Sequence, residues 1–291
     1  MLRAVLADTQ VIFSKDSLES ADVRHALAEL LDYRGRMAEA EQEYRAVFAA
    51  RGSFLGRDDP RTLAARKGIA RMSHQRGRLR EAEKEYRLVL DAYRASLGDR
   101  HPATLATRHD LAQVLHERGM FRQAEDELRQ ALETCQEVLG PQNPNTLAVR
   151  HELADLLRDR GLLTEAESQF RTVLDLLRSA YGDDHPDTVA ARYGLATVLR
   201  DRGWPGDAEL EFREVLEFRR KLLGDEHPGT LAVRHGLADL LMERGLLEEA
   251  EAEFREVYQA RGAVLGEQHP DTAAAREALD VVRRQLADRQ G

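Results

Sequence analysis

Apolar and polar residues along the chain repeat with a single period, which the prolines mark. Six of the eight prolines are spaced by 42 residues, at positions 60, 102, 144, 186, 228 and 270. Glycines recur at the same interval in two series, one beginning at position 35 and the other at position 56. Each period therefore holds two elements, and a glycine closes each of them.

The first element of each period is predicted to be a helix, which we call helix A. After Pro102, apolar residues recur at helical spacing, at Leu105, Leu111 and Leu115, until Gly119. The Thr two residues after the proline suits the N-terminal cap region. The glycine suits the C-terminal stop, because it tolerates a left-handed backbone. Both ends of helix A are thus encoded locally.

The second element, helix B, carries a stripe in which small and large residues alternate. Its commonest form reads Glu-Ala-Glu-x-Glu-aromatic-Arg, as in residues 81–87. The alanine occurs in all six copies, at Ala40, Ala82, Ala124, Ala166, Ala208 and Ala250. A bulky residue follows four positions later, at Tyr44, Tyr86, Leu128, Phe170, Phe212 and Phe254. Because alanine lets neighbouring helices approach closely, we expect this stripe to form the core.

Two charged series run along the predicted helices. The Glu after each alanine precedes an Arg by four residues, from Glu41 and Arg45 to Glu251 and Arg255, an order that favours ion pairs within the helix. Helix A carries an arginine row at Arg24, Arg66, Arg108, Arg150, Arg192, Arg234 and Arg276. We interpret this row as an ionic lattice between helices, whose alkyl stems cover the core. A ladder for acidic ligands is the alternative.

The period divides the chain into six full repeats and two partial ones. The full repeats are residues 17–58, 59–100, 101–142, 143–184, 185–226 and 227–268. Residues 1–16 match the second half of a helix B, and residues 269–291 form a lone helix A whose polar end can serve as a cap. The start of the array has no polar capping helix. This predicts either the C-terminal part of a longer protein or an end that pairs with another chain.

Composition and charge narrow the class of protein. Charged residues make up 33% of the chain and aromatic residues 5%, as in solvated helices that pack through small apolar faces. The net charge is -9 with basic residues dispersed among acidic ones, so nucleic acid is not an expected partner. No run approaches the roughly 20 apolar residues of a membrane span. The single Cys135 allows no intramolecular disulfide, and we expect a cytoplasmic protein.

The 42-residue pair of helices resembles the tetratricopeptide repeat in its long form, as found in kinesin light chains and in many actinobacterial proteins. The residues that fall on signature positions are Leu111, Ala112, Leu115, Gly119, Ala124, Leu128 and Ala131. Arg108 stands where the signature often has Trp. The resemblance covers essentially the whole chain. It implies an all-α fold, a right-handed α-solenoid of antiparallel helix pairs.

The resemblance also implies a scaffold or adaptor that binds a peptide or a partner helix in a concave groove lined by helix A. By the family's pattern the groove presents His25, Lys67, Arg71, His74, His109, Gln113, His116, His151, Asp155, Arg158, Tyr193, Arg200, His235, Asp239 and Met242, with Glu29, Asp32 and Thr197 between them. Its basic part lies in the second and third repeats and would favour an acidic peptide or a C-terminal carboxylate. A groove without ligand preference is the alternative.

One departure from the family affects the expected ligand. In kinesin light chains an asparagine row on helix A grips the backbone of the cargo peptide. The matching row here reads His25, Lys67, His109, His151, Tyr193 and His235. A kinesin-like cargo specificity is therefore in doubt.

The sequence does not indicate an enzyme, a cofactor or a metal. Four histidines precede a repeat proline and are expected to shape the turn: His101, His185, His227 and His269. The helix A histidines recur once per repeat, and stacked helices lie roughly 8 to 10 Å apart, which is too far for ligands of one zinc ion. Cys135 stands at a variable position of helix B, where nothing marks it as activated.

Other functions and one irregularity stay open. The array also resembles sensor or regulatory regions associated with STAND-type signalling ATPases, and the uncapped N-terminal end predicts possible self-assembly into homo-oligomers. The sequence Trp204-Pro205-Gly206 interrupts the turn of the fifth repeat. Proline suits the first turn of helix B, so Trp204 either packs over that turn or forms an exposed contact point.

Overall fold

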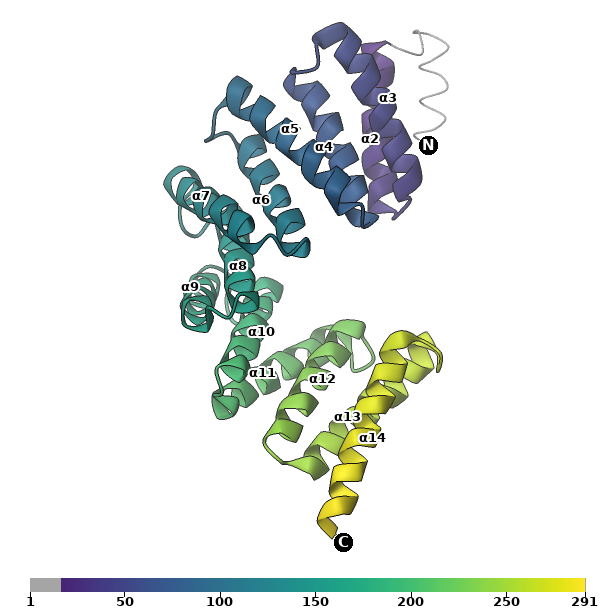
Figure 1. Cartoon of the computed structure of the whole chain (residues 1–291), viewed down its shortest axis with the longest axis vertical. Coiled ribbons are helices and arrows are strands. Elements are labelled where there is room, and N and C mark those ends of the chain that lie inside the picture. Colours follow the sequence, from purple (N-terminus) through teal and green to yellow (C-terminus); the bar gives the residue numbers. More distant parts are fainter. Residues whose placement is uncertain (1–16, 291) are drawn as a thin grey trace. The chain divides into compact units, whose positions relative to one another are not determined.

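The structure, a computed structural model, describes residues 17–290, and every regular element in this range is a helix (Figure 1). The helices are α2 (Leu18–Tyr33), α3 (Met37–Leu55), α4 (Pro60–Gln75), α5 (Leu79–Leu97), α6 (Pro102–Glu117), α7 (Phe121–Leu139), α8 (Pro144–Asp159), α9 (Leu163–Tyr181), α10 (Pro186–Asp201), α11 (Pro205–Leu223), α12 (Pro228–Glu243), α13 (Leu247–Leu265) and α14 (Pro270–Gln290). Even numbers are A helices and odd numbers are B helices. The all-α prediction is confirmed. The predicted half repeat at residues 1–16 lies outside the described residues.

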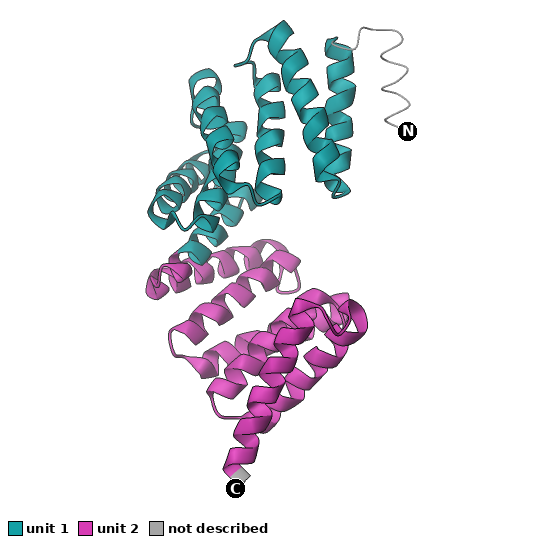
Figure 2. Ribbon diagram, turned by 45° about the vertical axis from the view of Figure 1, so that its right-hand side comes forward, with its two compact units in different colours: residues 1–156 teal, residues 157–291 magenta. Residues whose placement is uncertain are grey.

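The chain divides into two compact units, residues 1–156 (unit 1) and 157–291 (unit 2), shown in Figure 2. Within unit 1, each helix from α2 to α7 packs against the next one. Within unit 2, the same holds from α9 to α14. In unit 1, α4 also contacts α6, so neighbouring A helices lie close together. Each unit is therefore a stack of helix pairs, the repeat fold that the sequence predicts.

The residue before each proline caps helix A, which corrects the cap role that we expected of the threonine. A side chain at this position accepts a hydrogen bond of 2.9 to 3.2 Å from the backbone N–H two residues on, at Asp59, His101, Asn143, His185, His227 and His269. Proline restricts the preceding residue to extended backbone, which places that side chain at the open N–H groups. Thr104 is instead buried, and its hydroxyl donates to the Gly98 carbonyl at 2.8 Å.

Glycine closes both helices, as predicted. Gly35 ends α2 with φ at +69°, and its N–H donates to the Asp32 carbonyl at 2.8 Å. The next N–H, of Arg36, donates to the Leu31 carbonyl, also at 2.8 Å, which completes a Schellman motif. At the end of α3, Gly56 has φ 92° and ψ 159°, a region that is essentially restricted to glycine.

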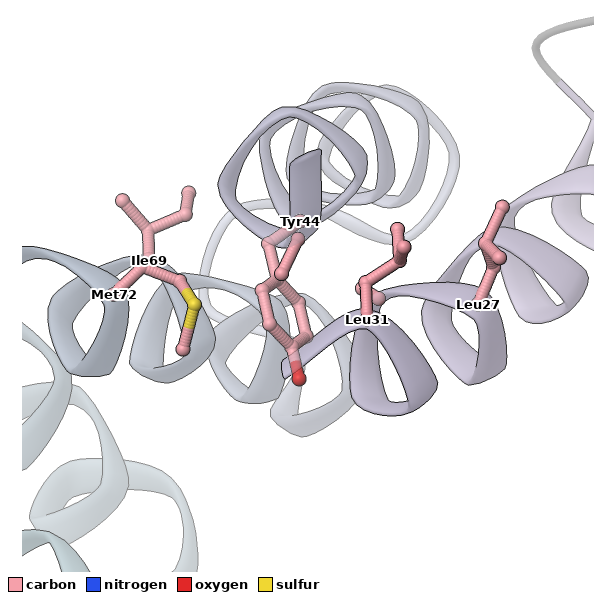
Figure 3. Packing of buried hydrophobic residues seen from close by; sticks show 7 residues of the cluster. Leu27, Leu31, Tyr44, Ile69 and Met72 are labelled. Atoms are coloured by element: carbon pink, nitrogen blue, oxygen red, sulfur yellow. The ribbon is translucent and has the colours of Figure 1, made fainter. Parts of the chain in front are cut away.

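The alternating stripe of helix B forms the core. The alanines of the stripe are 0% exposed, and each bulky residue four positions later is at most 1% exposed. In Figure 3, Tyr44 projects from α3 between Leu31 of α2 and Ile69 and Met72 of α4. One side chain of helix B thus packs against the A helices of two successive repeats. The predicted alternation of small and large residues is confirmed.

The arginine row of helix A forms ion pairs with its neighbours. Arg24 Nη1 lies 2.7 Å from Glu43 Oε2, and Arg66 Nε lies 2.6 Å from Glu85 Oε2. Arg108, Arg192 and Arg234 reach an aspartate after the preceding helix B at 3.0 to 3.3 Å: Asp99, Asp183 and Asp225. These contacts support the lattice interpretation rather than a ladder for acidic ligands.

A second set of ion pairs joins α3, α5, α9, α11 and α13 to the next repeat, and we call it the inter-repeat clamp. The Glu41 carboxylate is 1% exposed and lies 2.7 Å from Arg45, 2.6 Å from Arg76 and 2.7 Å from Arg78. Burial alone would raise the pKa of Glu41, but hydrogen bonds from Arg78 and Arg76 hold it below its ordinary value. The equivalent clamps are Glu83 with Arg87 and Arg118, Glu209 with Arg213 and Arg244, and Glu251 with Arg255 and Arg283.

The irregular turn of the fifth repeat starts a helix, as the proline predicts. Pro205 is the first residue of α11, and Trp204 precedes it. The Arg202 guanidinium lies 3.9 Å from the centroid of the Trp204 ring. This cation–π contact covers part of the indole, which stays 42% exposed.

Candidate functional site

The positions predicted to line a groove lie along one side of the A helices. In unit 1 we define the helix A face by the following residues: His25, Glu29, Asp32, Lys67, Arg71, His74, His109, Asp110, Gln113, His116, Glu117, His151, Glu152 and Asp155. Each of these residues is half-buried or exposed, whereas the aliphatic side chains between them are buried. Their contacts join neighbouring A helices, as follows.

Arg71 connects the helix A face to the core. Its guanidinium donates to the Tyr44 hydroxyl at 2.9 Å and lies 2.6 Å from the Asp32 carboxylate of α2. The Tyr44 ring descends into the core, and its hydroxyl lies at the end farthest from α3 (Figure 3). Burial raises the pKa of Tyr44, so the phenol stays neutral and accepts the hydrogen bond. Arg71 is therefore held by partners on two other helices.

Two contacts cross from α4 to α6. Lys67 Nζ lies 2.8 Å from Asp110 Oδ2, and His74 Nε2 lies 2.8 Å from Glu117 Oε1. Lys67, Arg71 and His74 were predicted to make the groove basic. Each of them faces a carboxylate of a neighbouring A helix. The predicted basic part is thus already matched with negative charge from the chain itself.

Glu152 of α8 contacts two polar side chains of α6. Gln113 Nε2 donates to Glu152 Oε2 at 2.8 Å, and His109 Nε2 lies 3.3 Å from the same oxygen. Burial would raise the pKa of Glu152, but its polar contacts with His109 and Gln113 hold the pKa below its ordinary value. This half-buried carboxyl is consequently ionised at neutral pH.

The other histidines of the face contact residues of their own repeat. His25 Nε2 lies 3.4 Å from Glu29 Oε1, and burial, assisted by Arg51, lowers the pKa of His25. His151 Nε2 lies 3.4 Å from Asp155 Oδ2. The His116 ring stands edge-on to Phe121, with 5.7 Å between centroids.

In unit 2 the predicted site residues form contacts both between A helices and within one helix. Arg158 Nη1 donates to the Thr197 hydroxyl at 3.1 Å. Arg200 lies 3.3 Å from Asp201, and His235 lies 3.8 Å from Asp239, in each case on the same helix.

Aromatic contacts take up part of the same side of unit 2. Tyr193 packs edge-on against Phe212 at 5.7 Å, and His235 packs against Phe254 at 5.2 Å. Met242 is half-buried. Burial lowers the pKa of His235 and raises that of Asp239. Tyr193 and Met242 thus add apolar surface to this side of unit 2.

Asp110, Glu117 and Glu152 are functional-site candidates that were not predicted from the sequence. Two signals could have found them. Asp110 and Glu152 stand at a position where four other repeats have Ala26, Gly68, Gly194 and Gly236. In addition, contacting residues on neighbouring A helices are 43 or 39 positions apart, which is the period of 42 plus one residue or minus three residues. These two offsets differ by four residues, or about one helical turn.

Other chemistry is sparse among the described residues. Cys135 is buried, and burial raises the pKa of its thiol, which disfavours the reactive thiolate. Within residues 17–290, no three His, Cys, Asp or Glu side chains are grouped so that they could hold a metal ion. No helix of the described part is both long and apolar enough to cross a membrane.

A cavity of about 750 Å³ lies in unit 2, away from the A helices' predicted groove positions. It is lined by Asp184, Arg213, Glu214, Glu217, Phe218, Lys221 and Leu222, which are residues of α11 apart from Asp184. Lys221 Nζ lies 2.9 Å from Glu217 Oε1 across one helical turn. The cavity is thus lined mainly by charged side chains of a helix B.

Solved structures show folds similar to this one. Nearly identical TPR-like repeats of a putative kinesin light chain from Podosopora anserina are 27% identical, with a TM-score of 0.61 over 69% of this chain and 96% of that one. The apo form of the quorum sensor NprR from B. thuringiensis is 11% identical, with a TM-score of 0.69 over 96% and 73%. A Rap protein complexed with Competence and Sporulation Factor is 14% identical, with a TM-score of 0.63 over 99% and 80%.

Sequence comparison gives the family. No curated protein matches the sequence significantly. Models of the tetratricopeptide repeat match residues 19–95, 61–137, 123–179, 145–221 and 230–271. These matches cover most of the chain, and the kinesin-light-chain-like form of the repeat agrees with the solved structures. The chain belongs to the tetratricopeptide repeat family.

Proposed function

We propose that this protein binds an extended peptide segment of a partner protein along the helix A face of unit 1. The observation that supports this function is the distribution of variable side chains. The clamp and core positions repeat from one copy to the next, whereas the helix A face changes in charge and hydrogen-bonding capacity at each repeat. Positions that the fold leaves free are those that a ligand can use.

The fold supports the same proposal. Tetratricopeptide arrays present successive A helices side by side, which gives an extended peptide several contacts of similar geometry. The Rap structure, a fold match to this chain, was solved with Competence and Sporulation Factor bound. In unit 1, half-exposed donors and acceptors such as Gln113 and Glu117 occur on this face at every step.

The ion pairs already present on the helix A face bear on the charge of the partner. An acidic partner, the prediction from sequence, would have to displace Asp110 from Lys67 and Asp32 from Arg71, because both cations are already paired. A partner that reaches the carboxylates would leave these two ion pairs intact.

The test is affinity capture from a lysate of the source organism, read by mass spectrometry. The face variant is Arg71→Gln with Gln113→Ala, which removes two hydrogen-bonding side chains without adding negative charge beside Asp32. The matched control is Glu217→Gln with Lys221→Ala on the exposed side of α11, whose two side chains pair in solvent. We expect a partner that is retained by the wild type and by the control and lost by the face variant.

The opposite result would overturn the proposal. If all three proteins retain the same partners, binding occurs elsewhere on the molecule. Circular dichroism and thermal melting of the three proteins show whether the face variant keeps its helices. Loss of folding would be seen as a lower melting temperature, in which case Gln113→Ala alone, at a half-exposed position, repeats the comparison.

A further inference from the structure

The helix A face carries more negative than permanent positive charge. On α2, α4 and α6 together with Glu152, its carboxylates are Glu29, Asp32, Asp110, Glu117 and Glu152, and its permanent cations are Lys67 and Arg71. Asp110 and Asp32 lie against these two cations. Three carboxylates remain, those of Glu29, Glu117 and Glu152. Each of them lies against a histidine and not against a lysine or an arginine.

The three remaining carboxylates are accessible to different degrees. The side chains of Glu29 and Glu117 are 62% and 53% exposed, and that of Glu152 is 20% exposed. Glu152 is nevertheless ionised at neutral pH, because its pKa is held below the ordinary value. The face therefore presents negative charge from α2 to α8, along the direction that an extended peptide would follow.

The excess of negative charge is specific to the helix A face, because the carboxylate rows of helix B are paired with arginines. In α3 and α5 of unit 1, each carboxylate of these rows lies no more than 2.9 Å from an arginine nitrogen, at Glu41, Glu43, Glu83 and Glu85. In those rows the fold supplies its own guanidinium groups. On the helix A face the positions opposite Glu117 and Glu152 hold His74 and His109 instead, and histidine, unlike arginine or lysine, is not a permanent cation.

A lysine fits the same position as His109, as the chain itself demonstrates. Lys67 occupies the equivalent position one repeat earlier, and its Nζ reaches Asp110, the residue equivalent to Glu152. The histidine at position 109 thus lies against Glu152 without supplying the permanent cation that a lysine supplies at position 67.

We propose that the partner segment bound by the helix A face is basic, and that its Lys or Arg side chains pair with Glu29, Glu117 and Glu152. This inference rests on the proposed function. The expected partner is an extended segment with cationic side chains. It binds by charge complementarity, so its affinity falls as the salt concentration rises. The carboxylates of the face are already positioned by contacts with Gln113, His109 and His74, so binding requires little rearrangement of them.

The probe is a phage-displayed library of random dodecapeptides, selected on the full chain at pH 7.5. The selected peptides are then labelled with fluorescein and measured by fluorescence anisotropy. We expect Lys and Arg to be enriched in them. We also expect their affinity to fall about tenfold for Glu117→Gln with Glu152→Gln, and by a similar factor for His109→Lys. Glu217→Gln, which removes one negative charge on α11, is the control and should leave the affinity unchanged.

The two substitutions separate charge from folding. Glu117→Gln with Glu152→Gln removes the negative charge, whereas His109→Lys keeps both carboxylates and supplies a competing cation in the geometry of Lys67. Selected peptides that are acidic or neutral, and that lose affinity for Arg71→Gln, would overturn the basic partner while the proposed function stands. Peptides that bind every variant equally, or a selection without enrichment, would overturn both.

Discussion

The third and fourth repeats of unit 1 and the fifth and sixth repeats of unit 2 use one position of helix A in opposite ways. In unit 1 it carries Asp110 and Glu152, whose carboxylates contact Lys67 and Gln113 of the preceding A helix. In unit 2 it carries glycine, and a Cβ added at Gly194 would lie 2.2 Å from the Phe170 ring. Where the glycine stands, an aromatic ring of helix B occupies the space of the side chain. Where the carboxylate stands, it bridges two A helices.

This difference teaches how a repeat protein can vary its surface without changing its fold. Gly236 in unit 2 and Gly68 in unit 1 face the Phe212 and Tyr44 rings in the same manner, at 3.3 Å and 2.6 Å from an added Cβ. The residue at this position therefore varies from repeat to repeat, within a fold that stays the same. Unit 1 thus contains both forms, with Gly68 against a ring and Asp110 and Glu152 as carboxylates, whereas Gly194 and Gly236 of unit 2 both lie against rings.

The largest effect is expected from moving the carboxylate of unit 1 into unit 2. In Gly194→Asp the new side chain would occupy the space of the Phe170 ring. Overpacking of a core costs about 1 to 3 kcal/mol, and an added buried charge increases that cost. We expect a loss of about 3 kcal/mol or more in the free energy of unfolding, measured by urea titration with circular dichroism.

A milder substitution serves as the control for this experiment. In Gly236→Ala the added Cβ would lie 3.3 Å from Phe212, so the ring must shift by only a few tenths of an ångström. The helix gains about 1 kcal/mol when alanine replaces glycine, which offsets the crowding. We expect stability close to that of the wild type. A stable Gly194→Asp protein would contradict the steric account of the glycines.

The second prediction compares the inter-repeat clamps of the two units. Glu41 in unit 1 contacts three arginines, whereas Glu209 in unit 2 contacts Arg213 and Arg244. Removal of one partner from a buried ion pair costs up to about 3 to 5 kcal/mol, but these arginines are partly exposed and regain water. We expect Glu41→Gln to lose about 2 kcal/mol and Glu209→Gln about 1 kcal/mol in urea titrations.

The Glu41 clamp also has a defined pH dependence. The pKa of Glu41 is lower in the folded state than in the unfolded chain, where a glutamate has a pKa of about 4.3. Its stabilising contribution is therefore complete above the unfolded value and is lost as the pH falls through the lower folded value. The stabilities of the wild type and of Glu41→Gln should converge in acid. A difference that persists below the folded pKa would show that the charge of Glu41 is not its cause.

The smallest effect concerns the ion pairs that cross the helix A face. A double-mutant cycle with Lys67→Gln and Asp110→Asn isolates one of them. Both side chains are about a quarter exposed, so we expect a coupling energy of only about 0.5 kcal/mol. A coupling above about 2 kcal/mol would mean that this pair is part of the structural core rather than an adaptable surface.

Much of the fold follows from local sequence, because a helix end is encoded within a few residues. The prolines, the glycines and the alanine stripe predicted the two helices of each repeat and their buried sides. The cap was assigned to the wrong residue, since Thr104 has a good capping side chain but lies two residues past Pro102.

The candidate site was less predictable, because its charge balance depends on pairs that lie one repeat apart. Lys67 and Arg71 have the composition of a basic surface when their own helix is considered alone. Their partners Asp110 and Asp32 are on neighbouring helices, at distances set by the stacking of the repeats. A net charge on such a face can be assigned only after the inter-helix offsets of 39 and 43 residues are known.

The inter-repeat clamp makes the length of this protein an adjustable quantity. The described clamps use the same two positions for the Glu and its helix B Arg. In four of them the Arg of the next repeat follows the end of its helix A, whereas in the last one Arg283 lies within α14. An inserted block of 42 residues would bring one new clamp, one new cap and one new ring, and it would leave the old junction chemistry unchanged. A block of 41 or 43 residues would place each Glu on the wrong side of its helix. The protein can thus be lengthened only by whole repeats of 42 residues.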